Sequence, residues 1–328
     1  MHTGTDNDIR NTTFINKAKV SSGVLLEIAK NRSLYMMLLP GTLFLIVFSY
    51  LPMAGIIIGF KDFRYYGNIF QSISQSDWVG LKNFQFLFST PNAYIITRNT
   101  VLYNMAFIFL GLVASVFIAI VVNEMKNRVV SRFYHATYFL PYFFSWVVVG
   151  YVIYSLLNMQ YGLLNTRLLP LLGVEPVSWY TEPKYWPIIL TLINLWKNTG
   201  YNSIIYLAAI TAINGEYFEA AELDGATRWQ QIKMITIPMI KPQMIILSIL
   251  AVGRIFSADF GLFYNVPLGS GTLFPTTSVI DTYVYTVLRS GEYGMATAAG
   301  LYQALVGFVL VLITNAVVRK LNPDYSLF

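Results

Sequence analysis

The charged residues of one polar interval could carry the protein's contact with a partner. The interval covers residues 214–242 and lies between two long apolar runs, so the chain must leave the bilayer there and return. Its acids precede its bases along the chain: Glu216, Glu219, Glu222 and Asp224, then Arg228, Lys233 and Lys241. Four carboxylates within nine residues are suited to a non-covalent docking surface. The alternative is an ordinary connecting loop, which any protein with several spans requires.

The pattern inside this interval predicts two short helices joined by a tight turn. One set of residues recurs at helical spacing: Glu216, Glu219, Ala220 and Leu223. This first helix should end near Asp224, because Gly225 lacks a Cβ and is suited to the left-handed conformation that closes a helix. Thr227 and Gln230 have the spacing of a capping box, so a second helix should begin there. We expect Pro238 to interrupt this second helix before the next span.

Composition identifies a membrane protein. Of the 328 residues, 55% are hydrophobic and 12% are charged, whereas soluble proteins average about 25% charged. Mean hydropathy is +0.55. The chain has no cysteine and two histidines, which excludes a disulfide framework and any metal site built on Cys or a His cluster. The net charge of +6 reflects short basic loops beside the spans and does not predict nucleic-acid binding.

The elements that must position the interval are six apolar runs, each long enough for a bilayer helix. They cover residues 34–60, 101–122, 133–157, 186–213, 244–263 and 296–318. An amphipathic helix is also predicted over residues 278–288, between the last two spans. The expected fold is an all-α membrane protein with six transmembrane helices. It would consist of an N-terminal tail, residues 1–33, and one transmembrane domain, residues 34–328, containing the 214–242 loop.

The distribution of basic residues predicts the orientation. Six spans place both termini on the same side of the membrane. Thirteen Lys and Arg lie on the side of the termini and the 214–242 interval, against six on the other side. The positive-inside rule therefore predicts that both termini and the interval are cytoplasmic.

The interval resembles a family motif. Glu219-Ala220-Ala221, three residues, Gly225, nine residues and Ile235-Thr236-Ile237-Pro238 resemble the E-A-A-x-x-x-G-x9-I-x-L-P motif of bacterial ABC importer permeases, with Ile237 in place of Leu as the one departure. In that family the first helix is the coupling helix, which seats in a groove of the cytoplasmic ATPase. The resemblance implies a type I importer fold and an ATPase-coupling role for these residues: Glu219, Ala220, Ala221, Asp224 and Gly225.

Four further stretches resemble the oligosaccharide-permease branch of this family. They are GFKDF from Gly59, YFLPYFFSWVVVGYV from Tyr138, LWKNTGYNSIIYLAA from Leu195 and DTYVYTVLRSGEYGMATAAGLYQ from Asp281. The resemblance thus covers most of residues 34–320. It implies a sugar permease, with an acidic oligosaccharide as one expectation for the substrate.

Polar residues inside the predicted spans are the candidates for a translocation path: Lys197, Asn198, Tyr201, Arg254 and Asp259. Polar groups in a bilayer are costly, and those retained usually face a cavity or a partner. One interpretation is structural: Asp259 neutralises Arg254 or Lys197 and holds two helices in register. The other is that the residues contact sugar hydroxyls, in which case two cations against one acid favour an anionic sugar such as a uronate.

The family resemblance also implies partners. The assembly would contain a second homologous permease, an ATPase dimer and an extracytoplasmic sugar-binding protein, within the lipid of a bacterial cytoplasmic (inner) membrane. The sequence has no G-x-x-x-x-G-K-[ST] loop, so we expect ATP hydrolysis in a separate chain, with no catalytic residue, metal or cofactor in this one. The alternative function is an ion-coupled secondary sugar transporter, which requires intramembrane carboxylates. Asp259 is the only acid well inside a predicted span.

Overall fold

A computed structural model describes residues 30–85, 89, 91–125, 127–321 and 323 of the chain. The first 29 residues of the predicted N-terminal tail lie outside this description. The chain forms two compact units, residues 1–57 and residues 58–328.

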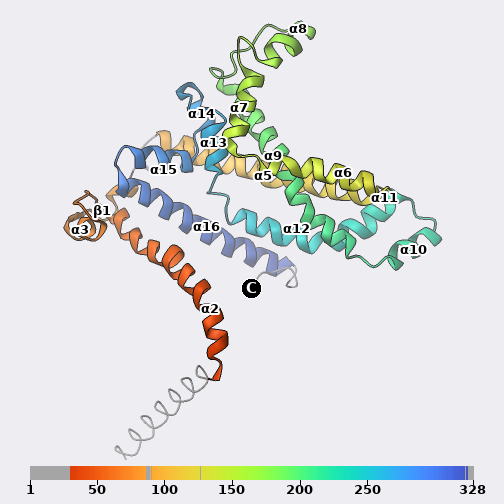
Figure 1. The fold of residues 1–328 in the computed structure, drawn as a ribbon, viewed down its shortest axis with the longest axis horizontal. Coiled ribbons are helices and arrows are strands. Elements are labelled where there is room, and N and C mark those ends of the chain that lie inside the picture. The colour runs from red at the N-terminus through yellow and green to blue at the C-terminus, as the bar shows by residue number, and fades with distance from the viewer. Residues whose placement is uncertain (1–29, 86–88, 90, 126, 322, 324–328) are drawn as a thin grey trace, which may run out of the picture. The chain divides into compact units, whose positions relative to one another are not determined.

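The first unit contributes a long apolar helix. Helix α2 (Arg32–Leu45) continues through a π-helical turn, η1 (Ile46–Tyr50), into a 3-10 helix, η2 (Leu51–Phe60) (Figure 1). This confirms the predicted first span. None of the side chains in α2 is buried, and Met37 is 78% exposed. An apolar helix with so little burial is suited to lipid or to a neighbouring protein helix rather than to water.

The remaining spans lie in the second unit. They are α5 (Pro91–Glu124), the broken pair α6 (Arg128–Phe139) and α7 (Trp146–Leu157), then α9 (Trp186–Thr211), α12 (Ile237–Val252) and α16 (Tyr293–Leu321). Helix α9 packs along α5, and α12 packs on α16. All six predicted segments are therefore helical. Among the described residues, strand structure is limited to the short antiparallel pair β1 (Lys61–Asp62) and β2 (Asp77–Trp78).

Not every span is strongly apolar. Four of the described helices are long and apolar enough to cross a membrane, or five if the bent pair α6 and α7 counts as one span. Helix α9 is not among them, although its 26 residues are long enough. Its apolar run is interrupted by polar side chains at Asn194, Lys197, Asn198 and Asn202. These interruptions place polar groups at the centre of the bundle.

The third span differs from the prediction of one continuous helix. Helix α6 passes into a 3-10 turn, η4 (Leu140–Phe143), and the chain then bends by 99° before α7. Pro141 stands in the first turn of η4, and Ser145 caps α7 by accepting a hydrogen bond from the Val148 N–H (3.3 Å). The bend leaves backbone carbonyls without helical partners, which another element must satisfy.

The fifth span also differs from the prediction. Helix α11 (Arg228–Gln231), a π-helical turn η7 (Ile232–Thr236) and α12 form one helix from Arg228 to Val252, so the expected interruption at Pro238 is wrong. Pro238 lies in the first turn of α12, directly after the π-helical turn, where the helix tolerates its missing N–H. The helix ends at Val252, eleven residues before the predicted end at 263, and a turn follows from Gly253.

Shorter elements complete the described structure. They are α3 (Ile69–Gln75), η3 (Lys82–Phe84), η5 (Leu164–Leu168), α8 (Leu169–Leu171), η6 (Pro183–Tyr185), α10 (Glu216–Leu223), α13 (Phe260–Asn265), η8 (Gly271–Leu273), α14 (Phe274–Thr277) and α15 (Ile280–Arg289). Helix α15 confirms the amphipathic helix predicted over residues 278–288.

The core of the second unit has two main parts. One part surrounds α13, which is buried among α5, α7 and α9 through Tyr103, Val149, Trp186, Leu190, Ile193, Leu262, Phe263 and Val266. The other joins α5, α9 and α12 through Val116, Ala119, Tyr206, Ile210 and Ile240. The two parts fix the ends of α5 and α9, and polar residues lie between them.

Candidate functional site

The predicted docking surface is a helix, a glycine turn and a second helix. Gly225 has φ +80°, and the Ala226 N–H donates to Ala221 O (2.8 Å), which closes α10 as the sequence predicted. Thr227 and Gln230 form the predicted capping box, in which the Thr227 N–H donates to Gln230 Oε1 (2.7 Å). These local interactions set the angle between α10 and α11.

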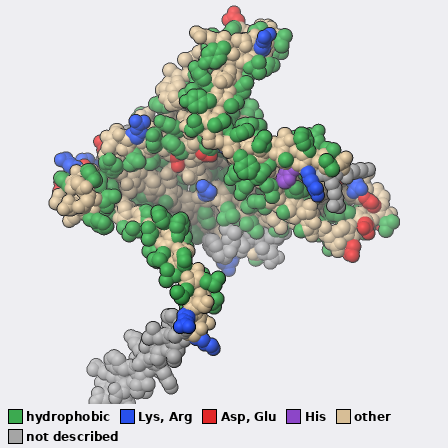
Figure 2. Space-filling model, in the orientation of Figure 1, with side chains coloured by type: hydrophobic (Ala, Val, Ile, Leu, Met, Phe, Trp, Pro, Cys, Tyr) green, Lys and Arg blue, Asp and Glu red, His purple; other side chains and the backbone are tan. Residues whose placement is uncertain are grey.

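The docking surface is exposed and strongly charged. No residue of α10 is buried. Of the five predicted coupling residues, Ala221 is half-buried, and the others, Glu219, Ala220, Asp224 and Gly225, are exposed. The acids of this region gather at the end of the molecule that carries α10 (Figures 1 and 2). Leu223 is 90% exposed beside them, so the surface combines negative charge with an apolar contact.

An ion pair braces the turn. Arg228 Nη2 lies 2.7 Å from Glu222 Oε1, which links α10 to α11 across Gly225. Both side chains are at least half exposed, so the pair adds little stability in water, about 0–1 kcal/mol. Its geometric effect is to limit the hinge motion of α10. Since α11 continues as one helix into α12, a displacement of α10 can pass directly into a span.

Lys197 closes the break in the third span. Its ammonium group donates hydrogen bonds to the carbonyl oxygens of Phe144 (2.6 Å), Tyr142 (2.7 Å) and Pro141 (3.3 Å). Lys197 is 6% exposed. The ammonium thus satisfies the carbonyls of Tyr142 and Phe144 at the bend between α6 and α7. Its third hydrogen bond goes to Pro141 O, which also accepts from the Phe144 N–H (3.2 Å). Lys197 is therefore a structural residue of the bend, a role that the sequence did not predict.

Asp259 has different partners from those expected. Its Oδ2 accepts a hydrogen bond from Trp146 Nε1 (2.8 Å), and its Oδ1 accepts from the N–H groups of Gly261 (2.9 Å) and Leu262 (3.3 Å) at the start of α13. The three salt bridges found within the described residues do not involve it. Among the described residues Asp259 therefore forms no direct ion pair with Lys197 or Arg254, although its charge acts on Lys197 at longer range. Its direct partners join α7 to the start of α13.

We expect Lys197→Met to destabilise the permease by about 2 kcal/mol, because buried carbonyl oxygens at the bend would lose their donors. Thermal unfolding of the detergent-purified protein would measure the loss. Lys184→Met is the matched control, since Lys184 lies in an exposed ion pair with Glu182 (3.6 Å). Equal unfolding temperatures for the two variants would contradict the structural role of Lys197.

A cavity of about 640 Å³ lies between α5, α9, α12 and the turn that follows α12. Four of the predicted path residues line it: Asn198, Tyr201, Arg254 and Asp259. The fifth, Lys197, is not among the lining residues, because its ammonium is turned to the bend. We call the cavity that Asn198, Tyr201, Arg254 and Asp259 line the transmembrane cavity.

Several lining residues were not predicted. Tyr142 lies parallel to Tyr201, with ring centroids 4.1 Å apart and an interplanar angle of 7°. Asn104 of α5 donates to Ile255 O (2.8 Å) and Ser257 O (3.2 Å), so it both lines the cavity and holds the turn after α12. Pro141 was the one sequence signal that pointed toward Tyr142, since it marks the break that brings this ring to the cavity.

The lining of the transmembrane cavity combines apolar surface with several polar side chains, one cation and one acid among the described residues. It offers side-chain amides, tyrosine ring faces and the guanidinium of Arg254, which forms no salt bridge with any described residue. Asp259 is the one acid among the described lining residues, and both of its oxygens already accept hydrogen bonds. The arrangement can therefore hydrogen-bond hydroxyl groups, stack on ring faces and pair with an anion.

A half-buried carboxylate holds the rim of this cavity. Asp281 Oδ2 accepts hydrogen bonds from the Ala258 N–H (2.7 Å) and Gln303 Nε2 (3.1 Å), and Gln303 also donates to Phe256 O (2.7 Å). Burial raises the pKa of Asp281 above its ordinary value, against the opposing effect of these hydrogen bonds. The network ties the first turn of α15 to the chain segment that carries Arg254 and Asp259.

The raised pKa of Asp281 predicts a pH dependence of stability. Folding favours the protonated acid, so its contribution is fully present below the unfolded pKa and is lost as pH rises through the folded pKa. The unfolding temperature of the wild type, relative to Asp281→Asn, should therefore fall as pH rises from about 4 to 8. A difference between the two proteins that stays constant over that range would contradict this assignment.

Comparison with known proteins identifies the architecture. Residues 111–323 match the family model described as "Binding-protein-dependent transport system inner membrane component". The chain is 33% identical over 305 residues to the polygalacturonan/rhamnogalacturonan transport system permease protein YteP of Bacillus subtilis (strain 168), covering 92% of each chain. It is 30% identical to the trehalose/maltose transport system permease protein MalF of Thermococcus litoralis, over 88% of this chain and 92% of that protein.

Two solved structures show the same fold. One is a bacterial ABC transporter involved in the import of the acidic polysaccharide alginate, with a TM-score of 0.82, 31% identity and coverage of 91% of this chain and 99% of that one. The other is a bacterial alginate ABC transporter in complex with a periplasmic protein that holds an alginate pentasaccharide, with a TM-score of 0.81, 31% identity and coverage of 90% and 96%.

These matches confirm the family resemblance and the predicted all-α fold, and they set aside the ion-coupled secondary transporter. The permease component of such a system is not an enzyme, since ATP hydrolysis belongs to a separate subunit. The chain belongs to the family of inner membrane components of binding-protein-dependent transport systems, as a multi-pass ABC importer permease of the type I fold.

Proposed function

We propose that this permease forms the translocation path for oligosaccharides that carry carboxylate groups. The observation that carries the proposal is the transmembrane cavity. Within the described residues, Arg254 forms no salt bridge there, and Asp259, the one acid of the lining, has both oxygens engaged in hydrogen bonds. An Arg guanidinium can form two parallel hydrogen bonds to a carboxylate. Asn198, Asn202 and Tyr201 would contact hydroxyl groups and a sugar ring face.

The relatives support an acidic substrate class over a neutral one. YteP is named for polygalacturonan and rhamnogalacturonan, and the matched structures belong to an importer of alginate. MalF of Thermococcus litoralis is named for trehalose and maltose, so family membership alone does not set the charge of the substrate. Arg254 is the feature of this chain that favours the acidic class.

The assembly that we propose contains a second homologous permease, an ATPase dimer and an extracytoplasmic sugar-binding protein. The exposed acids of α10 and the apolar Leu223 would seat on the ATPase, with both termini and α10 in the cytoplasm. The excess of basic residues on that side supports this orientation. The alginate importer, in complex with its periplasmic protein, supports the presence of a binding protein.

The coupling step would be a population shift driven by closure of the ATPase dimer. Closure would move α10, and the brace between Glu222 and Arg228 would transmit the movement to α11. Since α11 and α12 are parts of one helix, the movement would reach Ser248 and Ala251, which line the transmembrane cavity.

Uptake by the assembled importer in proteoliposomes, with its binding protein and ATP, tests the proposed substrate class. Tetragalacturonate and its fully methyl-esterified form are matched probes, because they differ in charge and share the sugar backbone. We expect ATP-dependent uptake of the acid to exceed that of the ester by about tenfold or more, from one charge-assisted hydrogen bond. Equal uptake of the two, or faster uptake of the ester, would refute the proposal.

A further inference from the structure

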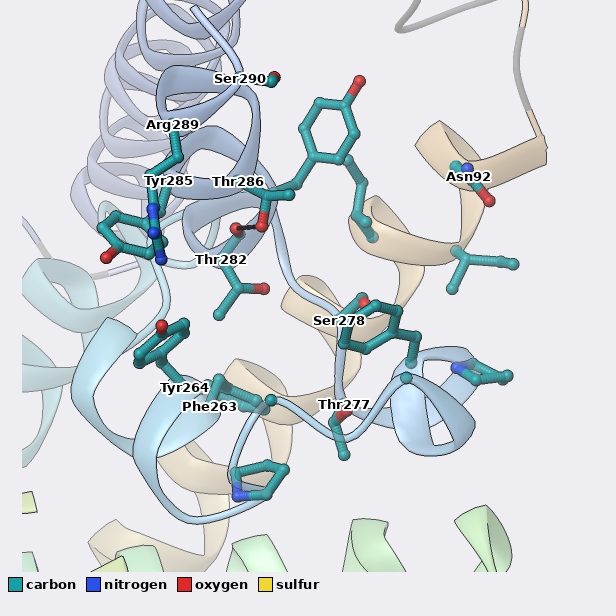
Figure 3. A pocket seen from close by; sticks show the side chains of 18 residues that line it. Asn92, Phe263, Tyr264, Thr277, Ser278, Thr282, Tyr285, Thr286, Arg289 and Ser290 are labelled. Atoms are coloured by element: carbon teal, nitrogen blue, oxygen red, sulfur yellow. Dashed lines mark hydrogen bonds between the residues drawn. The ribbon is translucent and has the colours of Figure 1, made fainter. Parts of the chain in front are cut away.

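A second cavity lies at the opposite end of α5 from the docking surface. It has a volume of about 870 Å³ and is bounded by the N-terminal end of α5, by α13, α14 and α15 (Figure 3). Asn92 and Ile96 line it near the start of α5, whereas Glu124 at the other end of α5 lies with Trp229 of α11 around a separate apolar pocket. The 34 residues of α5 span roughly 51 Å. This cavity is called the distal groove below.

One face of α15 forms a polar wall of the distal groove. Thr282, Tyr285, Thr286 and Arg289 all line the groove and follow helical spacing, so they share this face. The opposite face packs into the protein through Ile280 and Val287, which are buried. The amphipathic pattern of α15 therefore turns hydroxyls, a tyrosine ring and a guanidinium toward one open space (Figure 3).

The groove has positive charge without a neutralising acid. Of the described residues that line it, Arg289 is the one cation and none is Asp or Glu. The guanidinium lies over the ring of Tyr285, 5.9 Å from the centroid, and the salt bridges present in the described parts of the chain do not include it. The contact with the ring orients the guanidinium and leaves its hydrogen-bond donors available.

Aromatic rings form the neighbouring wall. Tyr264 of α13 contacts Tyr285 at a centroid distance of 5.1 Å and stacks on Phe260 at 4.9 Å. Phe260 also contacts Tyr285 at 4.8 Å. Rings that support one another in this way hold fixed positions, so the groove presents Tyr264 and Tyr285 as a prearranged surface beside a cation.

The distal groove is separated from the transmembrane cavity by α13. Asp259, at the start of this helix, lines the transmembrane cavity, whereas Phe263 and Tyr264, four and five residues later, line the groove. The hydrogen bond from the Ala258 N–H to Asp281 ties the start of α15 to the rim of the transmembrane cavity. The two cavities share no lining residue, but they are adjacent and mechanically linked.

We infer that the distal groove is a second carbohydrate site. It would hold an acidic oligosaccharide before the sugar enters the transmembrane cavity on the other side of α13. Arg289 would pair with a carboxylate, Tyr264 and Tyr285 would contact sugar ring faces, and Thr282 and Thr286 would contact hydroxyls. The volume lies within the range of about 300–1,000 Å³ that small-molecule sites have. The inference rests on the proposed function, which assigns an acidic substrate. The described lining of the groove, with Arg289 and without Asp or Glu, supports such a substrate independently.

Equilibrium binding to the assembled importer in lipid nanodiscs, without its binding protein, tests the inference. Pentagalacturonate and its methyl-esterified form serve as probes, and isothermal titration calorimetry measures binding. We expect Arg289→Gln to weaken binding of pentagalacturonate at one class of site by about tenfold, and to change binding of the ester by less than about twofold. Tyr285→Ala should weaken binding of both probes, whereas Tyr285→Phe should retain it.

Two controls assign the effect to the distal groove. Arg167→Gln removes an exposed arginine of η5 outside both cavities and should leave binding unchanged. Arg289→Gln should still weaken pentagalacturonate binding when Arg254 is also replaced by Gln, since the two cavities are separate. In transport, Arg289→Gln should raise KM for the acid about tenfold with little change in the maximal rate.

Distinct outcomes would overturn the inference. If Arg289→Gln and Tyr285→Ala weaken docking of the binding protein and leave pentagalacturonate binding unchanged, the groove is a protein-docking surface. If Arg289→Gln changes neither, the groove has no role in recognition. In both outcomes the wild type could still take up tetragalacturonate in preference to its ester. The binding experiment therefore tests the second site, whereas the uptake experiment tests the proposed function.

Discussion

Glu219→Lys is expected to abolish ATP-driven uptake while the permease remains folded. Glu219 is exposed on α10, and none of the salt bridges of the described structure uses its carboxylate, so reversal of its charge removes no intramolecular interaction found there. If α10 seats on the ATPase, the reversed charge faces a surface that accommodates an acid. A mismatched charge in such an interface costs about 2–5 kcal/mol, which corresponds to a loss of affinity of about thirtyfold or more.

Uptake by proteoliposomes and co-purification of the ATPase measure this loss together. Glu175→Lys is the matched control, because Glu175 is also exposed and lies between α8 and η6, away from α10. The control should retain uptake, and both variants should unfold at the wild-type temperature. An unaltered uptake rate in Glu219→Lys, with the ATPase still bound, would show that α10 is not the coupling surface.

Local signals were sufficient to predict the two short helices and the glycine turn that form the proposed docking surface. The left-handed Gly225 and the capping box of Thr227 with Gln230 depend on residues within one turn of each other, so the sequence contains all of the interacting groups. The same reason explains why the helical spans could be predicted from apolar runs. Pro238 is the exception, because a proline alone does not reveal that a π-helical turn will precede it.

The interior of the bundle was less predictable, because its interactions join distant parts of the chain. The bend of the third span depends on Lys197, whose hydrogen-bond acceptors lie 53–56 residues earlier. Trp146 and Asp259 are separated by 113 residues. Residue types and hydropathy identified Lys197 and Asp259 as costly groups that need partners, but the partners were set by packing. The sequence therefore predicted that these polar groups need partners, but not which groups those partners are.

The distal groove illustrates the same limit from the other direction. Amphipathic periodicity predicted α15, and that periodicity distinguishes the buried face from the exposed face. It does not show that Tyr264 of α13, which lies sixteen residues before the start of α15, contacts the ring of Tyr285. Recognition surfaces of this kind become visible only when the turn after α12 and the short helix α13 are placed.

Arg254→Gln is expected to remove the preference of the transmembrane cavity for acidic substrates. Arg254 is exposed to the cavity and forms no salt bridge with any residue that the structure describes, so its replacement leaves no partner charge unpaired there. A hydrogen bond between charged groups contributes about 1.5–3 kcal/mol, which predicts a decrease in kcat/KM for tetragalacturonate of about 10-fold to 150-fold. Uptake of the methyl-esterified form should change little, because the amide of Gln still donates hydrogen bonds to neutral oxygens.

Arg254→Lys and Arg64→Gln complete this experiment. Lysine keeps the charge but cannot form the two parallel hydrogen bonds of a guanidinium, so we expect it to restore part of the lost uptake. Arg64 is exposed and paired with Asp62 (3.4 Å) outside the transmembrane cavity, so its replacement should leave both probes unaffected. If Arg254→Gln lowers uptake of tetragalacturonate and of its methyl ester equally, Arg254 positions the turn after α12 and does not bind the substrate carboxylate. The acidic preference would then have to arise in the binding protein or the partner permease, because no other cation of the described structure lines this cavity.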